Sequence, residues 1–112
     1  RGFVARALVM DGHEVVACAD GAEALDRLTG DKTAFDLLLT DIRMPVMDGI
    51  ALALSAARDQ PGLTILLMTG YADQRERARG LETLIQDVIA KPFTLEEIRG
   101  RVARALTSRQ TA

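Results

Sequence analysis

The sequence has few of the residues that mark secreted, membrane-spanning or base-stacking proteins. It contains one cysteine, Cys18, so no disulfide can form within the chain, and a reducing, cytosolic compartment fits this composition. No apolar run approaches the ~20 residues of a membrane-spanning helix, and no stretch resembles a signal peptide. Tryptophan is absent and aromatic residues make up only 4%, which argues against a surface on which nucleic-acid bases stack.

Strong charge of either sign is also missing. The formal net charge is −2, too close to neutral to indicate a nucleic-acid-binding or membrane-binding surface. The chain has 112 residues, of which 48% are hydrophobic, a length typical of one domain with its own core. Composition therefore indicates a single globular domain and does not by itself assign a function.

The most informative stretch of the chain is residues 37–50. Three consecutive leucines at residues 37–39 predict a strand that is buried on both faces, as in the middle of a parallel sheet. The apolar run ends at Asp41, Pro45 cannot donate to a strand ladder, and Asp48-Gly49 is typical of a turn or a helix start. Asp41 is therefore expected at the carboxyl end of a buried strand, where open α/β sheets bind their ligands.

Helix and strand patterns alternate along the whole chain, which predicts a parallel sheet covered by helices on both faces. Spacings typical of capping boxes occur at Asp20–Glu23 and Thr94–Glu97, and Gly30 is a helix-ending residue. Helices are expected over residues 1–10, 20–30, 49–58, 73–81 and 94–106, strands over 13–18, 36–40, 63–68 and within 84–90, and a polar tail over 108–112.

Each of the last three predicted strands ends at a different polar residue: Asp41, Thr69 or Lys91. Taken singly, a threonine after a strand is an ordinary turn residue, and a lysine before proline commonly points into solvent. In a parallel sheet, however, these ends lie side by side. A carboxylate, a hydroxyl and an ammonium at one edge suit phosphoryl transfer to the carboxylate, with the ammonium acting as a point charge for phosphate.

Three motifs carry a resemblance to the receiver domain of bacterial two-component response regulators. They are LLTDIRMPVMDG at 38–49, LMTG at 67–70 and AKPF at 90–93. The resemblance extends over the whole chain and implies a flavodoxin-like, doubly wound parallel sheet of strand order 2-1-3-4-5.

The resemblance also implies roles for individual residues. Asp41 would accept a phosphoryl group from a histidine kinase or phosphotransferase, Thr69 would be the switch hydroxyl, and Lys91 would bind the phosphate. Mg²⁺ would be held by Asp41 and by the backbone carbonyl of Arg43. The bond before Pro92 is typically cis in this family. The expected protein is a regulatory phospho-acceptor with no other enzymatic activity.

One part of the family pattern is missing from this sequence. Receivers begin with an apolar strand that ends in an acidic pair holding the Mg²⁺, and here only the second to the fifth strands are found. Asp11 and Asp20 lie in turn or cap contexts and are not substitutes for that pair. Because the absent strand belongs between residues 13–18 and 36–40, its loss would leave buried backbone groups unpaired. We therefore expect the native polypeptide to extend upstream of Arg1, with 1–107 forming an N-terminally incomplete receiver.

The expected output of the domain is contact with another protein. Val88 stands where many receivers place a switching Tyr or Phe, so Tyr71 is a candidate for part of that role, although an ordinary loop aromatic remains an equal alternative. Movement of Thr69 would act on the 73–81 helix and bias a surface within residues 73–107. That face is expected to bind a downstream protein and no nucleic acid. Formation of a homodimer is a further possibility.

The sequence also bears on alternative functions and on a subfamily. An aspartate-nucleophile phosphohydrolase typically has a second acid two residues after the nucleophile, where this chain has Arg43. A nucleotide- or flavin-binding module would need a glycine-rich loop after a strand, and this sequence has none. A receiver-like interaction module that is never phosphorylated stays open. Residues 1–2, 11–13 and 68–72 resemble CpdR-type single-domain receivers, which serve as protease adaptors, although the chain could equally come from a hybrid kinase or a longer regulator.

Overall fold

The structure, a computed structural model, describes residues 2–30, 35–42, 47–70 and 85–111. Its elements in chain order are α1 (Gly2–Met10), α2 (Gly21–Gly30), β1 (Leu37–Asp41), α3 (Gly49–Asp59), β2 (Thr64–Thr69), β3 (Asp87–Ala90) and α5 (Leu95–Thr111). The predicted helix over 73–81 lies outside the described residues. No described helix is both long enough and apolar enough to span a bilayer.

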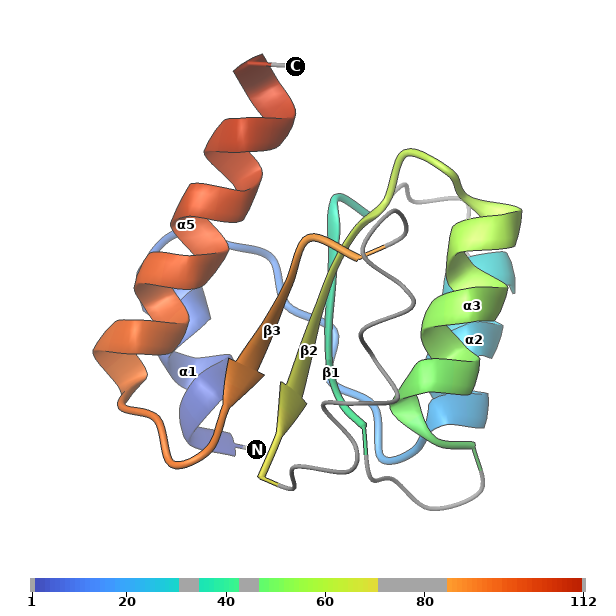
Figure 1. Cartoon of the computed structure of the whole chain (residues 1–112), viewed down its shortest axis with the longest axis horizontal. Coiled ribbons are helices and arrows are strands. Elements are labelled where there is room, and N and C mark those ends of the chain that lie inside the picture. Colours follow the sequence, from blue (N-terminus) through green and yellow to red (C-terminus); the bar gives the residue numbers. More distant parts are fainter. Residues whose placement is uncertain (1, 31–34, 43–46, 71–84, 112) are drawn as a thin grey trace.

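The three strands form one parallel sheet in the order β1-β2-β3. Helices α1 and α5 cover one face, and α2 and α3 cover the other (Figure 1). The α/β class, the parallel sheet and its two helical layers are therefore confirmed. The observed order is also the one that the predicted topology gives to its last three strands.

The side chains of β2 show why the sheet is buried on both sides. Ile65 and Leu67 point into the core shared with α2 and α3, whereas Leu66 points into the core shared with α1 and α5. All three are fully buried. Successive side chains along a strand point to opposite faces of the sheet. The unbroken apolar run at 65–67 therefore contributes to both cores, as expected for a strand buried on both sides.

Helix starts follow the predicted capping chemistry. Asp20 Oδ1 accepts a hydrogen bond of 2.9 Å from the Glu23 amide. Thr94 and Glu97 cap each other reciprocally, with bonds of 3.2 Å and 3.1 Å between each side chain and the other residue's amide. Helix α5 continues to Thr111, so most of the predicted polar tail is helical.

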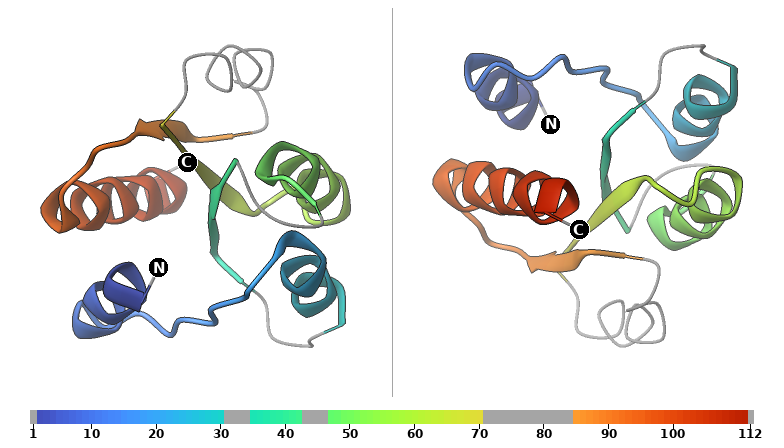
Figure 2. Two further views of the ribbon diagram at one scale, coloured as in Figure 1. Left: turned by 90° about the horizontal axis from the view of Figure 1, so that it is seen from below. Right: turned by 90° about the horizontal axis from the view of Figure 1, so that it is seen from above.

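The predicted strand over 13–18 is wrong for this structure, because the segment is irregular. A strand exists only with a ladder partner, and the described residues contain none for this segment; β1 pairs with β2 alone. Both views of Figure 2 place the segment beyond β1, on the side away from β2. Its apolar residues have the pattern of a strand, but the described residues supply no neighbouring strand for it to pair with.

Helices α1 and α5 are joined by an ion pair between residues 88 positions apart. The Arg99 guanidinium donates to both carboxylate oxygens of Asp11, through Nε at 2.9 Å and Nη2 at 2.7 Å. The hydrogen bond and charge of Arg99 hold the pKa of the Asp11 carboxyl below its usual range. This two-pronged contact connects the turn after α1 to α5.

Candidate functional site

The strand register brings the three predicted site residues to one edge of the sheet. Asp41 pairs with Met68 at the end of β1, and Thr69 pairs with Ala90 at the end of β2. Lys91 follows directly, and its amide donates a 2.7 Å hydrogen bond to the carbonyl of Thr69. All three strands end on the same side of the molecule (Figure 1), as the sequence pattern predicts.

Asp41 and Lys91 form a close ion pair. The Lys91 Nζ lies 2.6 Å from the Asp41 Oδ1, and the two side chains are 45% and 37% exposed. The Oδ1 atom itself is buried, and no partner meets it with hydrogen-bond geometry. The ammonium therefore neutralises the carboxylate mainly through charge, while much of each side chain remains open to solvent.

Thr69 is the last residue of the middle strand, between β1, which ends at Asp41, and β3, which Lys91 follows. The residue is 2% exposed, so its position is set by the core on both sides of β2. Thr40 is also buried, and its hydroxyl donates a 3.0 Å hydrogen bond to the Asp41 carbonyl. The end of β1 is thus held by a hydrogen bond from the residue before Asp41.

Gly49 supports the position of Asp41, a role beyond the helix-start chemistry that Asp48-Gly49 predicts. A Cβ atom at Gly49 would collide with the carbonyl oxygen of Asp41, and the Gly49 amide donates a 2.7 Å bond to Ile42 O. Asp48 caps α3 by accepting from the Ala51 amide at 2.9 Å. The Asp-Gly pair before an apolar helix is the sequence signal for this close approach.

The remaining predicted site residues have mixed outcomes. The Lys91-Pro92 peptide bond is cis, as the resemblance implies. Val88 is half-buried and packs against the core shared with α2 and α3. Tyr71 and Arg43 lie outside the described residues, so the predicted modulating aromatic and the predicted carbonyl ligand are not located.

The described residues do not by themselves form a metal site. They contain no cluster of three or more histidine, cysteine, aspartate or glutamate side chains that could hold a metal by itself. The Asp41 carboxylate, whose side chain is 37% exposed, is the kind of ligand that Mg²⁺ takes, since the ion typically binds one or two carboxylates and keeps several waters.

Comparison with known proteins gives consistent results. Response regulator MprA from Mycobacterium avium and from Mycobacterium tuberculosis are each 36% identical to the chain over 109 residues, which is 97% of this chain and 46% of theirs. The chain thus spans about half the length of these curated relatives.

Solved structures of similar proteins cover the chain equally well. A CheY-like receiver domain protein from Methanospirillum hungatei matches with a TM-score of 0.87 and 25% identity, covering 98% of this chain and 86% of that one. A putative response regulator from Chloroflexus aurantiacus matches with a TM-score of 0.79 and 30% identity, covering 95% and 87%. A family model described as "Response regulator receiver domain" matches residues 1–103. With the sheet edge described above, these matches show that the chain belongs to the response regulator receiver domain family.

Proposed function

We propose that Asp41 is the phospho-acceptor of this receiver, taking a phosphoryl group from the phosphohistidine of a sensor kinase or phosphotransferase. The observation that supports this proposal is the ion pair between Asp41 and Lys91. The pair joins a carboxylate at the end of β1 to a compact cation that directly follows β3, and the two residues are 50 positions apart in sequence. Such a pair offers a nucleophile and a charge for the incoming phosphoryl oxygens.

The proposed reaction uses the chain's own groups in distinct roles. A carboxylate oxygen of Asp41 attacks phosphorus, the phosphorus–nitrogen bond of phosphohistidine breaks, and the electron pair stays on the imidazole. The product is an acyl phosphate that carries roughly −1.5 to −2 charge in place of the single negative charge of the carboxylate. Lys91 offsets that charge, and the Thr69 hydroxyl donates a hydrogen bond to a phosphoryl oxygen.

Mg²⁺ is the proposed cofactor of this step. Asp41 and the carbonyl of Arg43 would hold it, together with an acidic pair upstream of Arg1. When bound, the ion neutralises charge on the transferring phosphoryl oxygens. The Asp41 carboxylate at the sheet edge, with its side chain 37% exposed, supports a cation at this position.

We also propose that residues 1–107 form a receiver whose remaining strand comes from upstream. Two features support it: the 13–18 segment lies beyond β1 without a ladder, and β1 pairs only with β2 among the described residues. A strand between them would give both edges a partner. The 108–112 tail lies outside this unit.

Phosphorylation is proposed to act on partner binding. Receivers are regulatory domains, and this one would switch a protein-binding surface within 73–107 through Thr69. Tyr71 is the proposed modulator, since Val88 offers no aromatic ring. Binding of a histidine kinase implies a cytoplasmic location, and the CpdR-like subfamily remains a prediction.

A phosphate-affinity gel tests the acceptor. The natural full-length polypeptide containing this chain is incubated with acetyl phosphate and Mg²⁺, and compared with Asp41→Asn and with Asp26→Asn, an exposed aspartate on α2. A retarded band is expected for the parent and Asp26→Asn only. Equal retardation of Asp41→Asn would exclude Asp41, and no retardation of the parent would favour the receiver-like module that is not phosphorylated.

A further inference from the structure

The first residue of α2 lies in close contact with the chain shortly after Asp41. Gly21 is buried, and a Cβ atom at this position would lie 2.5 Å from the carbonyl oxygen of Met47 and 2.9 Å from the Met47 Cβ. Both separations are shorter than those that Cβ atoms adopt in proteins. The start of α2 and the backbone at Met47 can therefore lie this close only because residue 21 has no side chain.

Helix α2 is anchored at both ends. The Asp20 side chain caps its first turn. Near its other end, Leu28 is buried in the core shared with α3, and the carbonyl of Leu28 accepts a 2.6 Å hydrogen bond from Nε2 of Gln60, the residue after α3. Because these contacts hold α2 in place, a group added at Gly21 is expected to displace the segment at Met47 and to leave the helix where it is.

A displacement at Met47 reaches Asp41 through Gly49. Met47 packs against the core shared by α2 and α3, and Gly49 follows it by two positions. The Gly49 amide donates a 2.7 Å hydrogen bond to the carbonyl of Ile42, and a Cβ at Gly49 would collide with the Asp41 carbonyl. No space separates the backbones at this second contact, and closely packed interiors transmit such shifts.

We propose that Gly21 is a positioning residue for the phospho-acceptor. Because it has no side chain, the start of α2 supports the Met47 backbone, and this support holds the turn before α3 against the Asp41 carbonyl. The inference rests on the proposed role of Asp41, since it concerns how that carboxylate is held for attack on phosphorus. Phosphoryl transfer depends on such placement, because a shift of about 1 Å in a reacting group can slow a reaction about a hundredfold.

The rate of phosphorylation by acetyl phosphate and Mg²⁺ tests this inference, measured in the natural full-length polypeptide on a phosphate-affinity gel. Gly21→Ala is expected to be labelled about tenfold more slowly than the parent, because the added Cβ displaces Met47 and so shifts Asp41. Gly30→Ala is the matched control on the same helix. Nothing lies within 4 Å of its Cβ position, so it should be labelled at the parental rate. A parental rate in Gly21→Ala overturns the inference.

Leu28→Ala separates a positioning role from a loss of stability. It removes a buried side chain from α2 and so weakens the packing of the helix, but it adds no group beside Met47. Rates are compared at a temperature at which circular dichroism shows every variant to be folded. Leu28→Ala is expected to be labelled like the parent, and a slowing equal to that of Gly21→Ala would overturn the inference, because weaker packing of α2 would then explain both.

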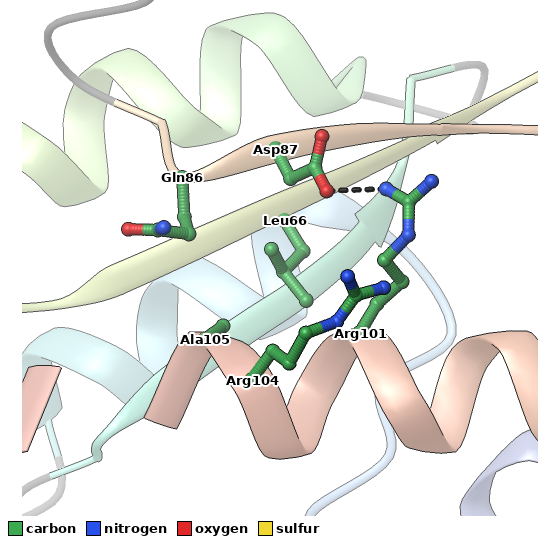
Figure 3. A pocket seen from close by; sticks show the side chains of 6 residues that line it. All are labelled: Leu66, Gln86, Asp87, Arg101, Arg104 and Ala105. Carbon is green, nitrogen blue, oxygen red and sulfur yellow. Dashed lines mark hydrogen bonds and ion pairs between the residues drawn. The ribbon is translucent and has the colours of Figure 1, made fainter. Parts of the chain in front are cut away.

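NMR spectra of the ¹⁵N-labelled polypeptide, recorded without a phosphoryl donor, follow the displacement itself. Gly21→Ala is expected to shift the amide signals of Ile42 and Gly49, the residues that meet beside Asp41. The Ala105 amide is the distant reference and should not shift, because Ala105 lies on α5 (Figure 3), which covers the face of the sheet opposite to α2. Unshifted signals of Ile42 and Gly49 overturn the inference, since the displacement then ends before Asp41.

Asp41→Asn on the same gel distinguishes failure of this inference from failure of the proposed phospho-acceptor. A parental rate in Gly21→Ala, with Asp41→Asn unlabelled, overturns only the positioning role. Labelling of Asp41→Asn at the parental rate overturns the acceptor, and with it the reaction that Gly21 is proposed to support.

Discussion

The Nζ of Lys91 lies 2.6 Å from the Oδ1 of Asp41, joining the ends of two strands that do not pair with each other. β2 lies between these two strands in the sheet. The ion pair therefore spans the end of the middle strand. The ion pair occupies the place where a phosphoryl group on Asp41 would be met by a cation.

Replacement of Lys91 by alanine should slow phosphorylation of Asp41 about ten- to hundredfold, the factor expected when a hydrogen bond or contact to a charged group is lost. Lys91→Arg should recover only part of the rate, because a planar guanidinium does not reproduce a compact ammonium. Initial rates with acetyl phosphate measure the effect. Arg58→Ala, an exposed cation on α3, is the control, and an unchanged rate in Lys91→Ala would contradict the assigned role.

Alanine at Gly49 should destabilise the fold by about 1–3 kcal/mol, the usual cost of forcing an extra group into a packed site. The added Cβ would collide with the Asp41 carbonyl, so β1 or α3 must shift. Gly100→Ala is the matched control: nothing lies within 4 Å of its Cβ position, and helix α5 should gain about 0.5–1 kcal/mol. Urea unfolding of both variants measures the difference, and equal effects would contradict the close approach.

The Asp11–Arg99 pair should make stability depend on acidic pH. Arg99 lowers the pKa of Asp11 in the folded protein, so the pair stabilises the fold above the ordinary carboxyl pKa of about 3.9. That contribution is lost as the pH falls through the lowered folded value. Asp11→Asn should therefore show a shallower loss of stability between about pH 5 and about pH 2 than the parent.

Thermal unfolding across this range is the measurement for Asp11→Asn. Asp26→Asn, which removes an exposed carboxylate on another helix, should keep the parental slope. An identical slope in Asp11→Asn would mean that the pair adds nothing to folding.

Cys18 should react slowly with iodoacetamide in the folded protein. Burial, followed by the charge of nearby Glu23, raises the pKa of its thiol, and the thiolate is the reactive form. The alkylation rate at about pH 8 should rise when the protein is unfolded in urea, relative to a free cysteine measured in the same buffers. A folded rate equal to that of free cysteine would contradict the protected environment.

Much of the site could be predicted from local sequence. The apolar run before Asp41 predicts a buried strand, and Asp48-Gly49 predicts a helix start; both are observed. Alternation of helix and strand patterns also predicts that Asp41, Thr69 and Lys91 share one edge. These features follow from residues close together in the chain, whose period and turn chemistry act locally.

Other features depended on partners that local sequence does not reveal. Residues 13–18 have a strand pattern but are irregular, because a strand is stable only beside another strand. Arg99 binds Asp11 and Arg101 binds Asp87, although nothing in the spacing of these residues predicts either pair. Both contacts arise when α5 packs on the sheet and beside α1.

The sequence by itself determined the layered α/β architecture and the order in which chemically useful residues follow the strands, because periodicity and turn residues act over a few positions. Only the tertiary structure decided which charges meet: Lys91 with Asp41, Arg99 with Asp11, and Arg101 with Asp87. Ion pairing depends on separations of a few ångströms in space, and those separations are set by how whole elements pack.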